Sequence, residues 1–240
     1  MKKQLNPANK LIVALDVPTA ADAMRWVSRL TKCGVTTFKV GSELFTAAGP
    51  EIVKKINAQG GRVFLDLKYF DIPNTMAGAV RRAAKLKPFL INVHALAGPK
   101  ALRECAKAVK KAGGGAKLIA VTILTSFDTA ELEKVNIKTP TKKTVIKLAR
   151  AALDCGLAGV VASPKETAQL RKMFGEKFLV VTPGVRPSWA AKNDQSRVAT
   201  PLKAIRDGAD FVVLGRPILS AKKPVDAVKI IIEEIESAGR

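Results

Sequence analysis

Eight short apolar runs, separated by amphipathic stretches, constrain the fold of this 240-residue chain more than any other feature. The runs are rich in Val, Ile, Leu and Phe, and most are almost continuously apolar, as strands buried on both faces should be. They cover residues 11–17, 36–41, 62–68, 89–95, 117–124, 158–163, 178–184 and 210–215. The sequence therefore predicts eight buried strands.

The stretches between the runs are predicted to form helices. Residues 19–34 open with a threonine cap candidate and close on a glycine, and residues 49–61 carry a proline near the first turn with glycines after the end. Residues 201–209 predict a short helix, and residues 223–237 predict the last one. Strand and helix alternating eight times is typical of an α/β fold, the (β/α)8 TIM barrel. An open doubly wound sheet is the alternative, because periodicity does not distinguish a closed sheet from an open one.

No linker or shift in composition divides the chain, so residues 1–240 are predicted to form a single barrel domain. The N-terminal lysines and apolar run resemble a signal peptide only faintly, because Asp16 interrupts the run and no cleavage site follows. No apolar stretch approaches the ~18 residues that a membrane helix needs. Three widely spaced cysteines without a C-x-x-C pair fit a reducing compartment. We therefore expect a cytoplasmic protein that does not associate with a membrane and has neither a disulfide framework nor a zinc site.

The net charge of +21, from 41 Lys and Arg against 20 Asp and Glu, is unusual. Such a charge attracts polyanions, so nucleic-acid binding is an alternative function from a different class. The basic residues are scattered along nearly every predicted helix, however, and only 5% of residues are aromatic, which leaves no visible stacking platform. We expect a generally basic surface and no nucleic-acid partner.

Polar residues gather near the C-terminal ends of the apolar runs, where barrels of this type carry their chemistry. Asp66 and Lys68 are two positions apart on one predicted strand, so their side chains share a face, and Asp71 follows. A lysine between two carboxylates is held protonated, which suits a proton donor or an electrostatic anchor. The alternative is a solvated salt bridge at a strand end.

A second group of residues follows the last two strands, where barrels often bind a phosphate. Gly215 and Arg216 come directly after the eighth strand, Arg186 follows the seventh, and Gln195 lies in the irregular stretch 185–199. A guanidinium can hold a phosphate with two hydrogen bonds. We expect the irregular stretch to be a mobile active-site loop. The alternative for Gly215 and Arg216 is a simple turn into the last helix.

Other signals are weaker. No glycine-rich fingerprint opens a helix, so neither a dinucleotide nor a nucleoside triphosphate is indicated. His94 lies in an apolar strand without a metal partner, and we predict a structural histidine rather than a general base. Trp189 lies in the irregular stretch and is either a packing residue or a cover for a ligand.

Seven motifs follow one another from Leu11 to Ile218: LIVALDV, FKVG, DLKYFDIPNT, VTILTS, TPGVRP, DQSRV and VVLGRPI. In this order and spacing they resemble the orotidine 5'-phosphate decarboxylase family, the last enzyme of de novo UMP synthesis. The resemblance implies a homodimeric (β/α)8 barrel. It also implies conversion of orotidine 5'-monophosphate to uridine 5'-monophosphate and carbon dioxide, with no metal and no organic cofactor.

The resemblance also implies roles for single residues. Lys68 would donate a proton to C6 of the pyrimidine, Asp66 would lie against the substrate carboxylate, and Lys39 and Asp71 would complete an alternating charge network. The partner subunit would contribute Asp71 and Thr75, so that active sites are shared across the dimer. The implied substrate-binding residues are Asp16, Lys39, Asp66, Asp71, Ile72, Thr75, Thr125, Arg186, Gln195, Gly215 and Arg216.

Two further alternatives belong to the same barrel group. Sugar-phosphate decarboxylases and hexulose-phosphate synthases share a D-x-K-x-x-D element and resemble a magnesium-dependent chemistry, but they lack the IPNT and DQSRV segments that this chain carries. An inactive structural relative is disfavoured, because every motif position is present. Phe70 is a minor departure, since many relatives carry a histidine or another polar residue there.

Overall fold

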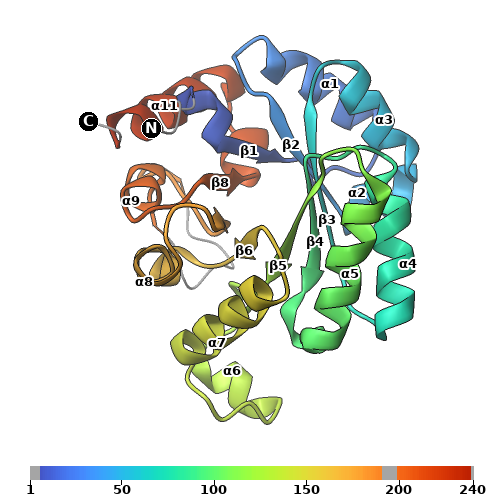
Figure 1. Ribbon diagram of the computed structural model, residues 1–240. Coiled ribbons are helices and arrows are strands. Elements are labelled where there is room, and N and C mark those ends of the chain that lie inside the picture. The colour runs from blue at the N-terminus through green and yellow to red at the C-terminus, as the bar shows by residue number, and fades with distance from the viewer. Residues whose placement is uncertain (1–5, 191–198, 239–240) are drawn as a thin grey trace.

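The computed structural model describes residues 6–190 and 199–238, and its centre is a closed barrel of parallel strands (Figure 1). Within those residues the strands are β1 Leu11–Ala14, β2 Thr37–Gly41, β3 Arg62–Tyr69, β4 Leu90–His94, β5 Lys117–Val121, β6 Gly159–Val161, β7 Leu179–Thr182 and β8 Phe211–Leu214. Each strand pairs in parallel with the next, and β8 pairs with β1 to close the ring. The predicted (β/α)8 barrel is confirmed, and the open doubly wound sheet is excluded.

Helices surround the barrel and connect its strands (Figure 1). They are α1 Ala20–Thr31, α2 Ser42–Ala48, α3 Glu51–Ala58, α4 Pro73–Ala84, α5 Gly98–Ala112, α6 Thr129–Lys134, α7 Thr141–Asp154, α8 Pro164–Phe174, α9 Pro201–Arg206, α10 Arg216–Leu219 and α11 Pro224–Ser237. Two 3-10 turns, Pro7–Lys10 and Ala95–Ala97, precede β1 and follow β4. None of the helices within the described ranges is long and apolar enough to cross a membrane.

Helix ends follow the capping residues that the sequence offers. The Thr19 hydroxyl accepts a hydrogen bond from the backbone N–H of Asp22 at 3.1 Å, which starts α1. Helix α5 ends at Ala112 because Gly113 takes a φ of 71°, a left-handed conformation that glycine adopts without steric cost. The stretch predicted as one helix over 49–61 is α3, and α2 is a separate helix before it.

Several predicted strands are too long at their C-terminal ends. Strand β1 ends at Ala14 and β5 at Val121, although their apolar runs continue to Val17 and Leu124. Leu15 and Val17 are buried although they lie beyond the end of β1. The apolar run over residues 11–17 therefore indicates which residues are buried, not where strand pairing ends. The residues beyond each strand end form the loops that carry the candidate site.

The apolar residues pack in two layers. One cluster fills the barrel interior with Ile12, Ala14, Phe64, Leu90, Ile119, Val181, Phe211 and Val213. A larger cluster lies between the strands and the helices, where Leu11, Val13 and Leu65 point outward from the barrel. Because neighbouring strand residues alternate between these layers, Asp66 and Lys68 follow Phe64 on the inward face. The interior packing therefore forms the floor of the site above it.

Candidate active site

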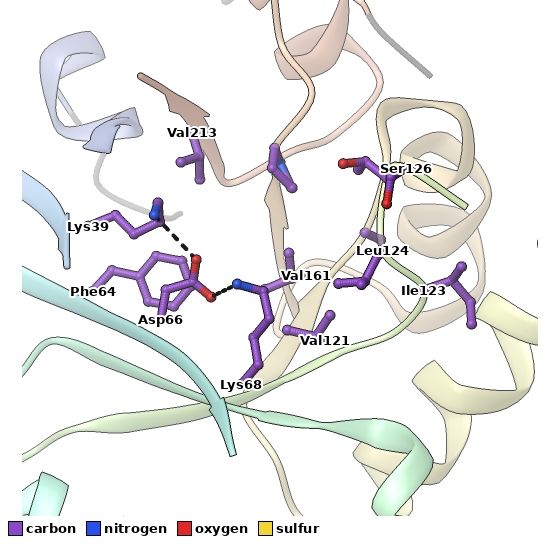
Figure 2. Close-up of a pocket in the computed structure, with 13 residues that line it drawn as sticks. Lys39, Phe64, Asp66, Lys68, Val121, Ile123, Leu124, Ser126, Val161 and Val213 are labelled. Carbon is purple, nitrogen blue, oxygen red and sulfur yellow. Dashed lines mark ion pairs between the residues drawn. The ribbon is translucent and has the colours of Figure 1, made fainter. Parts of the chain in front are cut away.

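A cavity of about 280 Å³ opens at the C-terminal ends of the strands, above the interior packing (Figure 2). Its lining combines the charged side chains of Lys39, Asp66 and Lys68 with a mainly apolar wall. Phe64, Val121, Ile123, Leu124, Thr125, Ser126, Val161, Ala162, Pro183 and Val213 form that wall. The cavity can therefore hold a flat, partly apolar group against a row of charges.

Asp66 is the centre of the charged row. One of its oxygens, Oδ1, lies 2.8 Å from Nζ of Lys68, and the other, Oδ2, lies 3.5 Å from Nζ of Lys39. Lys39 in turn donates a hydrogen bond of 2.9 Å to Oδ1 of Asp16. Figure 2 shows the two ammonium groups on opposite sides of the Asp66 carboxylate. The described charges therefore alternate in sign from Asp16 to Lys68.

Lys39 is nearly buried, with 12% of its side chain exposed. Burial by itself lowers the pKa of the Lys39 ammonium, but the charges of Asp66 and Asp16, and the hydrogen bonds to them, outweigh it and raise the pKa above its usual value. Lys39 therefore stays a cation throughout the neutral range. Gly41 lies close to it, since a Cβ there would stand 2.9 Å from the ammonium nitrogen.

Lys68 projects from an irregular part of β3. The pairing of β3 with β4 shifts register between Leu65 and Tyr69, and Lys68 has a φ of 49°. Non-glycine residues adopt this left-handed conformation rarely, and mostly where the surrounding structure holds them. The irregularity sits at the end of the strand, where the side chain of Lys68 lines the cavity.

A second, smaller cavity of about 120 Å³ adjoins the first and shares Lys39, Pro183 and Val213 with it. Its other lining residues are Ala14, Asp16, Gly184, Val185, Arg186, Leu214, Gly215, Arg216 and Pro217. Arg186 is buried and Arg216 begins the short helix α10. The loops after β7 and β8 thus bring both predicted arginines to one place.

The predicted residues Asp71, Ile72 and Thr75 line neither cavity in this chain. All three are exposed: Asp71 and Ile72 lie between β3 and α4, and Thr75 lies in the first turn of α4. The carboxylate of Asp71 accepts a hydrogen bond of 2.6 Å from the N–H of Ile72. Among residues 6–190 and 199–238, the carboxylate that pairs with Lys68 is that of Asp66, and the expected place of Lys68 between two carboxylates stays a prediction. Gln195 lies outside the described residues.

Comparison with known proteins gives the family. The model of the orotidine 5'-phosphate decarboxylase / HUMPS family matches residues 9–231. The chain belongs to this family. A relative from Halorhodospira halophila, named orotidine 5'-phosphate decarboxylase, is 49% identical over 96% of this chain and 97% of its own. One of the same name from Trichlorobacter lovleyi is 47% identical over 95% of each chain.

Solved structures agree with this assignment to the family. The crystal structure of orotidine 5'-phosphate decarboxylase from Lactobacillus acidophilus matches with a TM-score of 0.82 and 36% identity, over 95% of this chain and 99% of that one. An uncharacterized conserved protein from Geobacillus kaustophilus matches with a TM-score of 0.79 and 34% identity, over 94% of this chain and 99% of that one. The barrel is therefore that of the family.

His94 lies close to Lys68, at one end of the row of alternating charges. Burial, and then the charge of Lys68, lower the pKa of the imidazole below its usual value. Its Nδ1 accepts a hydrogen bond of 3.3 Å from the N–H of Leu96, and its ring stacks on Phe70 with centroids 5.4 Å apart. These contacts favour a neutral, structural histidine, as the sequence predicts.

Asn92 is the polar residue that the sequence analysis missed. It lies on β4, is fully buried, and donates a hydrogen bond of 2.6 Å from its amide nitrogen to Oδ1 of Asp66. A signal for it exists in the sequence, because Asn92 interrupts the apolar run FLINVHA at a position that shares a face with Leu90. That face points into the barrel interior, beneath the cavity.

Proposed function

We propose that this chain catalyses the decarboxylation of orotidine 5'-monophosphate to uridine 5'-monophosphate and carbon dioxide in pyrimidine biosynthesis. One observation carries the proposal: the alternating charges of Lys39, Asp66 and Lys68 lie in one cavity, and the adjoining cavity is lined by Arg186 and Arg216. A carboxylated pyrimidine fits the first cavity, and its 5'-phosphate fits the second. The names of the relatives support the same reaction.

The chemistry follows from the charges. As the bond between C6 and the carboxylate breaks, carbon dioxide leaves and the electron pair stays on C6. The Lys68 ammonium lies on the cavity wall, stabilises that negative charge and then transfers a proton to C6, which forms the C–H bond of the product. Asp66 holds Lys68 in place at 2.8 Å and stands against the substrate carboxylate. Lys39 lies on the other side of the buried Asp66 carboxylate, with its ammonium 3.5 Å from Oδ2.

Binding at a distance from C6 supports this step. Asp16 and Lys39 take the ribose hydroxyls, and Thr125 lies on the pyrimidine side of the first cavity. Arg186, Gly215 and Arg216 grip the phosphate, with Gln195 as a further contact. A Cβ on Gly215 would stand 3.2 Å from the Cβ of Ala14, so glycine lets the loop after β8 lie close to the end of β1. Binding energy from the phosphate can then favour closure of the loop after β7 and raise the rate of the chemical step.

The active form that we propose is a homodimer with shared sites. Asp71, Ile72 and Thr75 are exposed and lie outside the cavities of their own chain, so they are free to enter the site of a partner subunit. Phe70 and Ile72 expose 62% and 66% of their surface beside Asp71, which is unusual for large apolar side chains. A dimer contact would cover them.

The proposal also covers the domain organisation, the compartment and the cofactor requirement of the chain. We propose that residues 1–240 act as one domain in the cytoplasm and that the reaction needs no metal or organic cofactor. In the described ranges, no group of three or more His, Cys, Asp and Glu side chains is placed to hold a metal ion. The magnesium-dependent sugar-phosphate chemistry of the same barrel group stays the alternative, because it shares the D-x-K-x-x-D element.

The test is the loss of absorbance when orotidine 5'-monophosphate is added to the purified protein, with and without EDTA. Rapid conversion to uridine 5'-monophosphate at the same rate in both samples is the expected result. Activity that disappears with the chelator, or a folded dimer that converts no substrate, would favour the sugar-phosphate alternative instead. Sugar-phosphate substrates with magnesium then form the second arm of the assay.

A further inference from the structure

Asn92 is a buried polar side chain with no direct part in the proposed reaction. Its amide makes two hydrogen bonds, and both reach the strand that carries the candidate proton donor. The nitrogen, Nδ2, donates to Oδ1 of Asp66 at 2.6 Å, and the oxygen, Oδ1, accepts from the backbone N–H of Lys68 at 2.8 Å. Reversing the amide would set its oxygen against the carboxylate, so the two bonds fix its orientation.

The bond to the backbone falls where the sheet is irregular. Pairing of β3 with β4 passes from Leu65 and Ile91 to Tyr69 and Val93, so β3 contains more residues than β4 between the two pairs. The N–H of Lys68 bonds to the side chain of Asn92 there, and Lys68 takes a φ of 49°. Asn92 thus contacts the irregular backbone turn of β3 at Lys68, from which the Lys68 side chain extends.

The bond to the carboxylate acts on the same pair. Oδ1 of Asp66 accepts a hydrogen bond from Nδ2 of Asn92 and also lies 2.8 Å from Nζ of Lys68. Lys39 lies on the other oxygen at 3.5 Å. With a donor on each side and 11% of its side chain exposed, the carboxylate has one orientation in which all these contacts are made.

We propose that Asn92 is a positioning residue, whose single amide sets both the orientation of the Asp66 carboxylate and the backbone turn that aims Lys68 at the substrate. The inference rests on the proposed function, because it concerns the proton donor of that reaction. The two effects of the Asn92 amide can be separated by experiment. The oxygen of Asn92 acts on the Lys68 backbone, and the nitrogen acts on Asp66.

Asn92→Asp separates them, because it keeps an oxygen for the Lys68 N–H and replaces the donor to Asp66 by a second carboxylate. Two carboxylates in contact cannot both ionise easily and share a proton. The charged or titratable groups around them are Lys39, Lys68, Asp16 and His94. We expect kcat to fall by about 100-fold at neutral pH, the effect of a misplaced reacting group. We also expect the acidic limb of the pH profile of kcat to move to higher pH.

Asn92→Ala removes both bonds. We expect a similar fall in kcat at every pH, no shift of the acidic limb, and little change in the Kd for uridine 5'-monophosphate. Asn57→Ala is the matched control, because Asn57 donates to the carbonyl oxygens of Leu86 and Lys87 at 3.1 and 3.2 Å, away from both cavities. It should lower stability and leave kcat and its pH profile unchanged. Asn92→Ser replaces Asn92→Ala if the latter does not fold.

Hydrogen–deuterium exchange gives a readout that needs no turnover. Exchange at the Lys68 amide should be faster in Asn92→Ala than in the wild type, and close to wild type in Asn92→Asp. Equal exchange in all three proteins, or a kcat loss no larger than in Asn57→Ala, would overturn the proposal. A wild type that does not convert orotidine 5'-monophosphate would remove the proposed function and the catalytic half of this proposal. The exchange data would still decide whether Asn92 holds the turn.

Discussion

Asp66 illustrates, at the scale of one residue, how a buried charge organises a site. Burying a lone carboxylate is costly, and Asp66 avoids that cost because Lys39, Lys68 and the amide of Asn92 surround it. The same contacts fix its direction and that of Lys68. The site can therefore be strongly charged and rigid before any substrate arrives, which is the condition for electrostatic catalysis.

Lys39 supports a prediction about pH. Burial lowers the pKa of its ammonium, but Asp66 and Asp16 raise it by more. A lysine with a higher pKa in the folded state stabilises the fold fully below its unfolded pKa of about 10.4, and that stabilisation is lost as the pH rises through the folded value. In urea unfolding above about pH 10.4, the wild type should therefore lose stability more steeply than Lys39→Met. Parallel curves for the two proteins would contradict this.

At the scale of elements, the neighbouring strand β7 leaves no room for a side chain at Gly159 on β6. A Cβ on Gly159 would overlap the carbonyl oxygen of Leu179 and stand 2.6 Å from its Cβ. Leu179 cannot move away easily, because its own strand is paired on both sides. Glycine is therefore required here by backbone contact and not by backbone conformation.

Gly159→Ala should lower the free energy of unfolding by about 1–3 kcal/mol, the usual effect of overpacking. Gly78→Ala is the matched control, because Gly78 lies within α4 and a Cβ there would meet no atom within 4 Å. Alanine favours a helix more than glycine does, so this variant should gain up to about 1 kcal/mol. Denaturant unfolding measures both. Equal stability of the two variants would show that the contact at Gly159 relaxes freely.

The elements also show how far the sequence predicts the structure. Apolar runs predict all eight strands, because each strand is buried on both faces, but they do not distinguish the closed barrel from an open sheet. They do not predict where β1 ends, because Leu15 is as buried as the strand residues before it. The bond from Asn92 to Lys68 depends on the register shift between β3 and β4. No local pattern encodes that shift, so the charged residues and the inward face of Asn92 can be predicted from the sequence, but the bond from Asn92 to Lys68 cannot.

At the scale of the whole molecule, the proposed dimer assigns a function to residues that one chain leaves exposed. Lys68 and Asp71 would meet only across two subunits, so an inactive Lys68→Ala chain and an inactive Asp71→Ala chain should complement each other. In a mixed dimer, one of the two sites has both residues. After full exchange of equal amounts, activity should recover to about a quarter of the wild-type value, since half of the dimers are mixed. No recovery despite confirmed exchange would contradict shared sites.

The net charge of +21 is also a property of the whole molecule. Between residues 72 and 127, Glu104 is the only acidic residue, whereas Lys and Arg recur along α4 and α5. Binding that depends on charge alone weakens steeply with salt. We therefore expect any complex with nucleic acid to disappear from a gel shift at moderate salt. A complex that survives there would add a second function without affecting the first.

Turnover by Lys68→Ala tests whether Lys68 is the proton donor. Wild type, Lys68→Ala and the control Lys54→Ala, whose lysine pairs with Glu51 on α3, would be assayed with orotidine 5'-monophosphate after each is shown to be folded. In Lys68→Ala, Asp66 keeps its contacts with Asn92 and Lys39, so the fold should persist. We expect normal turnover by Lys54→Ala and none by Lys68→Ala. Near-normal turnover by Lys68→Ala would contradict the assignment of Lys68 as the proton donor.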